Sequence, residues 1–203
     1  VFIGRKVYAV FGVIGIAPEA TLIGVKVLHG GSGSFGSLIC GILHAATTAR
    51  ADVINMSLGA VFATSDPGVG RLVAALNKVV NFAMRNGALV ISSAGNDSID
   101  ADHSGNLMIT PGQSGNGLAI SATGPLGYAL GANNFARISS YTNYGNSLVA
   151  VAGPGGDFAY PGNENCSVAL ATGAALVRPC WVFDMVLSTT RTGYGWAAGT
   201  SMA

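Results

Sequence analysis

The chain contains 203 residues, a length that suits one large domain. Only 9% of its residues are charged, against about 25% in an average soluble domain, and 50% are hydrophobic. Ten Lys and Arg residues are balanced by nine Asp and Glu residues, which leaves a net charge of +1. This composition excludes a disordered chain, and it argues against a nucleic-acid-binding protein because it provides no basic field.

The first quarter of the chain shows the start of a strand–helix–strand pattern. The hydrophobic runs predict a buried strand over Leu22–Leu28, a glycine-serine loop over His29–Gly36 and a second strand over Val53–Leu58. Between the loop and the second strand, apolar residues at helical spacing predict a helix that Ser37 caps and that ends near Ala51.

The same alternation continues through the middle of the chain. It predicts, in order, a loop, a helix and two further strands: Gly59–Gly70, Arg71–Arg85, Ala88–Ser93 and Leu118–Ala122. Units of this length pair their strands in parallel, so the pattern predicts an α/β fold with a helix-covered parallel sheet. After about Gly124 we expect short strands and turns. No linker or repeat divides the chain, so residues 1–203 are taken as one domain.

The longest apolar run extends from Val7 to Ala17, where Pro18 ends it. A membrane-spanning helix needs about 20 apolar residues, so the run is too short and we expect no membrane partner. Arg5 and Lys6 before the run are similar to the basic start of a secretory signal, and that interpretation is the alternative.

Three loops follow the carboxyl ends of the predicted strands: Gly30–Ser34, Ser57–Gly59 and Ala94–Asp97. Ligands of open parallel sheets bind beyond these strand ends, so we expect a binding site there. The segment Gly31–Gly36 also has the G-x-G-x-x-G pattern of dinucleotide-binding loops. That pattern requires an acidic residue about 20 positions later, at the end of the next strand, and none stands there. A nucleotide site is therefore the weaker interpretation.

Three cysteines are too few for a disulfide framework. Cys40 lies on an apolar helix face, where we expect a buried small hydrophobic side chain. Cys166 and Cys180 flank a polar stretch and could pair if the protein is exported, which would contribute roughly 3 kcal/mol in the entropic model.

The last five residues, Gly199-Thr200-Ser201-Met202-Ala203, are identical to the nucleophile motif of the subtilisin-like serine proteases, the subtilases of peptidase family S8. Four further segments resemble family motifs in the same order along the chain: Gly12–Pro18 with Val25–Leu28, Asp52–Gly59, Ser93–Asn96 and Ala152–Gly156. The resemblance covers residues 12–203. It implies a three-layer domain with a mostly parallel twisted sheet and helices on both faces.

The resemblance also implies roles for individual residues. Ser201 would be the nucleophile, and Asn96 would donate its side-chain amide to the oxyanion beside the Ser201 backbone N–H. A polypeptide substrate would lie between loops, with one pocket wall from Ser57, Leu58 and Gly59, a facing wall from Ser93, Ala94 and Gly95, and a second edge from Gly31, Ser32 and Gly33.

The sequence departs from the family at the other two catalytic positions. It contains neither an Asp-[Ser/Thr]-Gly motif nor a His-Gly-Thr-His motif, and we expect both to lie upstream of Val1. His29, His44 and His103 do not stand where a base is needed. We therefore expect a partial domain, truncated at both ends and inactive alone. The alternative is a non-catalytic peptide-binding remnant of a subtilase.

The remaining expectations concern cofactors, partners and location. No ligand set for a metal stands in the sequence, so we expect no cofactor here, although calcium could bind the complete domain. We expect a secreted protein that is monomeric when complete, because its low charge content is more common in secreted enzymes than in cytosolic ones.

Overall fold

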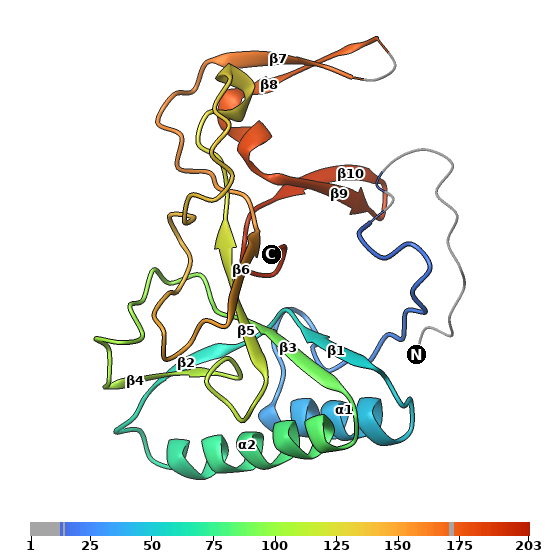
Figure 1. Ribbon diagram of the computed structural model, residues 1–203, viewed down its shortest axis with the longest axis vertical. Coiled ribbons are helices and arrows are strands. Elements are labelled where there is room, and N and C mark those ends of the chain that lie inside the picture. The colour runs from blue at the N-terminus through green and yellow to red at the C-terminus, as the bar shows by residue number, and fades with distance from the viewer. Residues whose placement is uncertain (1–12, 14, 171–172) are drawn as a thin grey trace.

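The computed structural model describes residues 13, 15–170 and 173–203. Its centre is a sheet of four parallel strands in the order β1-β3-β5-β6 (Figure 1). The strands are β1 (Val53–Met56), β3 (Leu89–Ser93), β5 (Leu118–Thr123) and β6 (Val151–Pro154). This arrangement confirms the predicted α/β fold with a parallel sheet.

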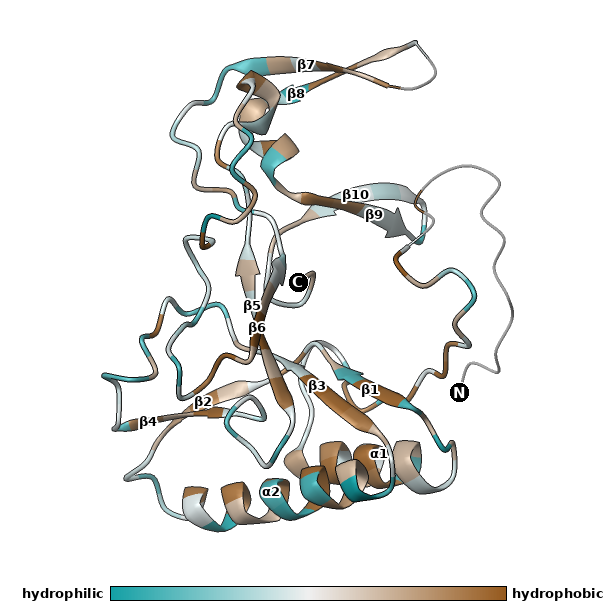
Figure 2. Ribbon diagram, viewed as in Figure 1, coloured by the Kyte–Doolittle hydropathy of each residue, from teal (hydrophilic) through white to brown (hydrophobic). Residues whose placement is uncertain are grey.

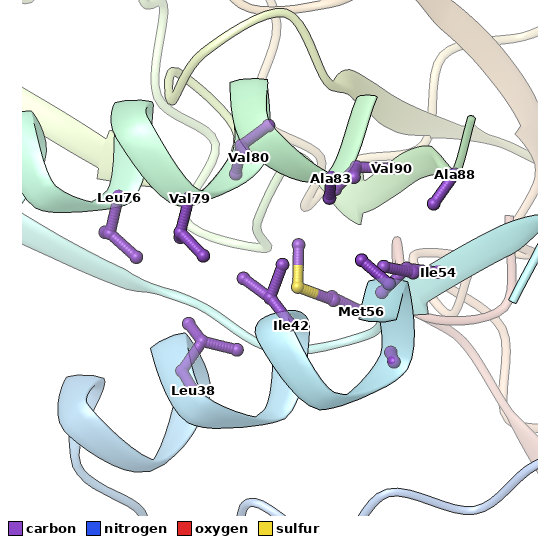
Figure 3. Close-up of a cluster of buried hydrophobic side chains, with 12 residues drawn as sticks. Leu38, Ile42, Ile54, Met56, Leu76, Val79, Val80, Ala83, Ala88 and Val90 are labelled. Atoms are coloured by element: carbon purple, nitrogen blue, oxygen red, sulfur yellow. The ribbon is translucent and has the colours of Figure 1, made fainter. Parts of the chain in front are cut away.

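Two helices cover one face of the sheet. α1 (Phe35–Thr47) and α2 (Val69–Arg85) pack on each other and on β1 and β3. Figure 3 shows the core between them, where Leu76 and Val79 of α2 point toward α1 and Ile42 of α1 lies beside Met56 of β1. The opposite face carries Val53 and Leu89, whose side chains are 52% and 36% exposed. Among the described elements, helices therefore cover one face, and the second helical layer that the resemblance implies is not among them.

Burial explains where these elements form. β3 is coloured as mostly hydrophobic along its length in Figure 2, and alternate residues such as Val90 face the helices. α2 ends at Arg85, two residues before Gly87, whose φ of +89° suits glycine just after a helix end. No helix in the described part of the chain has the length and apolar character to cross a membrane.

The N-terminal part differs from the prediction in three ways. Leu22–Leu28 forms no regular strand, although Val25 and Val27 pack against the helical core. The N-cap of α1 is Ser34 instead of Ser37, and its Oγ accepts a hydrogen bond from the Ser37 N–H at 3.1 Å. Cys40 is exposed, so the expectation of a buried thiol was wrong.

Short antiparallel strands make up the rest of the structure. β2 (Ala60–Ala63) pairs with β4 (Leu107–Thr110), and neither strand was predicted. The last third contains the hairpins β7 (Asn165–Ala169)–β8 (Ala175–Pro179) and β9 (Val186–Thr190)–β10 (Gly193–Ala197). Two short 3₁₀ helices complete the structure: η1 (Tyr128–Leu130) between β5 and β6, and η2 (Cys180–Asp184) between β8 and β9.

The β7–β8 hairpin is closed by a disulfide bond. Cys166 of β7 and Cys180 at the start of η2 are bonded, with a Cα–Cα distance of 4.8 Å. The predicted pairing of these two cysteines is confirmed. The bond ties the hairpin to the segment that leads into β9, at the end of the molecule far from α1 and α2 (Figure 1).

Candidate active site

The site begins where β1 and β3 end. These neighbouring strands are parallel and in register, with Met56 opposite Ser92, so the loops that follow them leave the sheet at the same edge. The loop after β1 contains Ser57, Leu58 and Gly59, and the loop after β3 contains Ala94, Gly95 and Asn96. The topology therefore brings two of the three expected binding loops together.

The third component is a turn that follows β10 and carries Ser201. The turn is closed by a hydrogen bond from the Met202 N–H to the Gly199 carbonyl at 3.0 Å. The Gly199 N–H donates to the carbonyl of Gly155, just after β6, at 3.1 Å. The Ser57 Oγ donates to the Ser201 carbonyl at 3.2 Å. These contacts place the exposed Ser201 beside the loop that follows β1.

A cavity of about 320 Å³ lies between these three segments. Seven of the predicted site residues line it: Ser57, Leu58, Gly59, Ser93, Gly95, Asn96 and Ser201. The other lining residues are Ala60, Val61, Asp97, Ile109 and Thr110. The close approach of Thr110 explains the glycine at position 59, because a Cβ on Gly59 would lie 2.6 Å from the Thr110 carbonyl oxygen. Ala94 is fully buried and does not line the cavity.

Asn96 is fixed from the nucleophile side. Its Oδ1 accepts hydrogen bonds from the backbone N–H of Thr200 at 2.9 Å and from the Thr200 Oγ1 at 2.8 Å. The same Thr200 Oγ1 accepts the Gly95 N–H at 3.2 Å. Because Thr200 occupies Oδ1, the Asn96 Nδ2 remains as the donor that the side chain can offer to a ligand. The sequence motif contained Thr200, but its spacing gave no sign of this contact.

The loop Gly31–Gly33 lines a separate, neighbouring cavity of about 380 Å³. Ser57, Leu58 and Gly59 line both cavities, so they form the wall between them. Gly33 has no room for a side chain, since a Cβ there would lie 2.5 Å from the Val27 carbonyl oxygen. The structure thus places this predicted substrate edge across from the loop that follows β1, away from Ser201 itself.

The turn after β6 is held by a buried polar cluster. The Tyr141 hydroxyl donates to the carbonyls of Gly155 at 3.0 Å and Gly156 at 2.8 Å. Burial raises the pKa of this hydroxyl, which keeps it protonated as a donor. Asp157, which is fully buried, accepts hydrogen bonds from the Arg137 Nη1 at 2.6 Å and the Ser140 Oγ at 2.7 Å. The cluster thereby supports the turn that contacts the nucleophile motif.

All three histidines lie in the described part of the chain, and none lines the cavity of Ser201. His29 makes a backbone bridge with Ser32, and His44 lies in α1. The His103 Nδ1 lies 2.8 Å from a carboxylate oxygen of Asp100, and its side chain is 84% exposed. This hydrogen bond raises the pKa of His103.

The acidic run after Asn96 serves the loops around it. The Asp102 carboxylate accepts the N–H groups of Asn146 and Ser147, both at 2.8 Å, and these hydrogen bonds lower its pKa. Across residues 13, 15–170 and 173–203, no group of three His, Cys, Asp or Glu side chains is placed to hold a metal ion.

The fold thus brings the Asn96 side chain, from a loop at the carboxyl edge of the parallel sheet, beside Ser201, from the turn after β10. A serine beside an amide donor is an arrangement that acyl-transfer chemistry uses. The family model of the subtilase family, Peptidase S8, matches residues 5–203. The chain belongs to the subtilase family, as the resemblance implied.

Proteases are among the relatives and solved structures that match. The chain is 32% identical to subtilisin NAT of Bacillus subtilis subsp. natto over 203 residues, which cover 91% of this chain and 47% of that protein. It is 30% identical to thermitase of Thermoactinomyces vulgaris over 169 residues, covering 83% and 51%. The chain thus spans about half the length of these relatives.

The fold of the nisin leader peptidase NisP from Lactococcus lactis matches with a TM-score of 0.68 at 19% identity, covering 88% of this chain and 51% of that one. A lanthipeptide protease structure matches with a TM-score of 0.66 at 24% identity, covering 88% and 50%. At these identities the two structures support the fold.

Proposed function

We propose that the complete protein is a serine endopeptidase that cleaves polypeptides through an acyl-enzyme on Ser201. The observation that carries this proposal is the shared cavity of Ser201 and Asn96, in which Thr200 binds the Asn96 Oδ1 and leaves Nδ2 to donate. Family membership supports the same chemistry.

In the proposed reaction, the Ser201 Oγ attacks the carbonyl carbon of the scissile bond and loses its proton to a base. The carbonyl oxygen becomes an oxyanion, which accepts hydrogen bonds from the Asn96 Nδ2 and the Ser201 backbone N–H. The tetrahedral intermediate then expels the amine, and water hydrolyses the remaining ester. For subtilisin, the type case of this asparagine donor, loss of the donor costs roughly 10²–10³ in turnover.

The base and the acid that orients it are proposed to come from a segment outside these 203 residues. None of the three histidines lines the cavity, and His103 is bound to Asp100 on the surface. Without a base, the Ser201 hydroxyl stays a weak nucleophile near neutral pH. We therefore propose that residues 1–203 alone bind peptide without turning it over.

An extended peptide is proposed to lie between the two neighbouring cavities. Ser57, Leu58 and Gly59 form the wall that the cavities share, and Gly31–Gly33 lines the far side of the second one. Backbone groups on both sides of an extended chain allow strand-like pairing, which binds many sequences through the main chain. This arrangement supports a polypeptide substrate.

The test is covalent labelling of the full-length protein with an organophosphorus probe, combined with peptide hydrolysis. We expect the probe on Ser201 by peptide mapping and no label or hydrolysis in a Ser201→Ala variant. We expect an Asn96→Ala variant to keep peptide affinity and lose turnover roughly 10²–10³-fold. An unlabelled Ser201 together with peptide binding would instead establish the non-catalytic remnant.

We also propose that the protein is exported. The Cys166–Cys180 disulfide supports export, because such bonds persist in oxidising compartments. Fractionation of the producing organism tests this proposal. Recovery of the full-length protein only from the reducing cytosol, with Cys166 and Cys180 free, would contradict it.

A further inference from the structure

The loop that carries Asn96 has little regular structure of its own. It leaves β3 after Ser93 and runs through Gly95, whose φ of +100° is a left-handed conformation. An oxyanion donor stabilises a transition state only if it is already in position before charge develops. Something must therefore hold the backbone on both sides of Asn96, beyond the contacts of its side chain with Thr200.

The Asn143 side chain makes those contacts. It is fully buried and comes from the loop between β5 and β6, 47 residues after Asn96. Before Asn96, its Nδ2 donates to the Ala94 carbonyl at 2.9 Å, and its backbone N–H donates to the Gly95 carbonyl at 3.0 Å.

After Asn96, the Asn143 Oδ1 accepts the backbone N–H groups of Asp97 at 3.0 Å and Ile99 at 2.9 Å. The Nδ2 also donates to the Asp97 Oδ2 at 3.1 Å. A side-chain amide has two donor hydrogens and two acceptor lone pairs, and all four are used here. Only a carboxamide matches this set, because the loop presents two donors to one end and two acceptors to the other.

Packing reinforces these hydrogen bonds. A Cβ on Gly95 would collide with the Asn143 Nδ2, so the glycine lets the loop approach the amide closely. The buried amide and the glycine therefore select one backbone path for residues 94–99. On that path Asn96 faces the cavity of Ser201 and meets Thr200.

We propose that Asn143 is a positioning residue of the oxyanion hole, which fixes the backbone on both sides of Asn96 and thereby raises turnover without contacting the substrate. This inference rests on the proposed function. It assigns to Asn143 an effect on kcat through Asn96 that exceeds its effect on KM, because Asn143 bonds the loop after β3, whereas Ser57, Leu58 and Gly59 line the cavity from the loop after β1.

The first experiment compares Asn143→Ala and the same-sized Asn143→Asp with Thr142→Val in the full-length protein. Thr142 is a similarly buried neighbour whose Oγ1 accepts the Ala122 N–H and donates to the Asn143 carbonyl at 3.1 Å. Its substitution therefore perturbs the backbone around Asn143 and leaves the side-chain hydrogen bonds of Asn143 to the Asn96 loop in place. We expect both Asn143 variants to lose roughly 10–100-fold in kcat, with KM within about threefold, when active sites are counted. Thr142→Val should lower thermal stability and keep kcat. If Thr142→Val lost as much kcat as the Asn143 variants, the proposal would be overturned.

The second experiment repeats Asn143→Ala in an Asn96→Ala background. If Asn143 acts through Asn96, the second substitution should change kcat by less than about threefold, because residues that act as a unit are not additive. The same 10–100-fold loss in both backgrounds would contradict a positioning role. The cycle therefore separates positioning from a general loss of stability.

A third measurement needs no activity. Hydrogen–deuterium exchange of the Asp97 and Ile99 amides should become about tenfold faster in Asn143→Ala and stay unchanged in Thr142→Val. Unchanged exchange would refute the claim that Asn143 fixes the loop. A full-length protein without any turnover would refute only the proposed function, because the exchange result would still decide whether the loop is held.

Discussion

The Asp157–Arg137 pair offers the sharpest test of how the nucleophile turn is supported. Asp157 is fully buried and Arg137 is 32% exposed, with 2.6 Å between Oδ2 and Nη1. Asp157→Asn keeps the side-chain volume and removes the charge. Its new NH₂ group, if placed at Oδ2, would face two donors, the Arg137 guanidinium and the Ser140 N–H.

The expected cost follows from this geometry. Removing one partner of a buried ion pair costs about 3–5 kcal/mol. Water can reach the exposed third of Arg137, so we expect the lower range of roughly 2–4 kcal/mol. For a domain of this size, that corresponds to a melting temperature lower by roughly 4–16 °C.

The pH dependence gives an independent check. Burial raises the pKa of Asp157, but hydrogen bonds from Arg137 and Ser140 lower it by more, so the pKa lies below the ordinary 3.8. A lowered pKa stabilises the fold fully above the unfolded value and loses that contribution as pH falls through the folded value. The difference between wild type and Asp157→Asn should therefore be constant from about pH 5 to 8 and shrink below about pH 4.

The assay is thermal unfolding of the full-length protein between pH 3 and 8, with Arg137→Gln and the double variant completing a cycle. We expect a coupling energy of about 1–3 kcal/mol between the two positions at pH 7. A loss below about 0.5 kcal/mol for Asp157→Asn, or the same loss at pH 3 as at pH 7, would refute this reasoning.

Two further predictions concern the nucleophile motif and the hairpin. Thr200→Val removes the Oγ1 that binds Asn96, so we expect kcat to fall roughly 5–10-fold, about one hydrogen bond, with KM unchanged in steady-state assays. A Cys166→Ser, Cys180→Ser double variant should lose about 3 kcal/mol of local stability, seen as faster hydrogen exchange in β7 and β8. The kcat of this double variant should equal that of the wild type, because neither cysteine lines the cavity of Ser201. A fall in kcat alongside the loss of stability would contradict this and show that the hairpin supports the site.

The elements that sequence reasoning found share a strong local signal. The helix predicted over Arg71–Arg85 matches α2 except for two residues at its start. It could be predicted because apolar residues recur along it at helical spacing. β3 and β5 are short apolar runs bounded by turn residues, and both lie where they were predicted. Local periodicity was sufficient wherever burial against one helical face decided the structure.

The failures have a common cause in partners that local patterns do not specify. Leu22–Leu28 is as apolar as a strand, and Val27 packs on the core, but a regular strand needs a continuous ladder of backbone hydrogen bonds. In the described part of the chain, this segment has an isolated bridge at Gly24 and no such ladder. β2 was hidden inside a predicted loop, because four residues with intermediate burial give no alternation. Its pairing with β4 joins segments about 50 residues apart.

In the site, too, the sequence motifs indicated residues but not the contacts between them. Ser201 and Asn96 could be predicted, since each lies in a motif that the chain shares with the family. The contacts that hold them could not: Thr200 meets Asn96 across 104 residues, and Asn143 meets Asp97 across 46. A one-dimensional pattern points to the groups that we propose to act, whereas the residues that hold them in place emerge only when the sheet brings the loops together.

These contacts also separate two parts of the proposed chemistry. The proposed oxyanion donor Asn96, the proposed nucleophile Ser201 and the shared pocket wall are held by hydrogen bonds that begin and end within the described residues, including Ser57 to Ser201 and Thr200 to Asn96. The proton-transfer groups are not among them. Electrostatic stabilisation and substrate binding act without the base. Subtilisin-type enzymes that lack triad members still retain roughly 10³–10⁴-fold catalysis over water from these two effects. The part of the site that lies within the described residues should therefore already be organised for the transition state. The base would then add proton transfer to a site whose geometry does not depend on it.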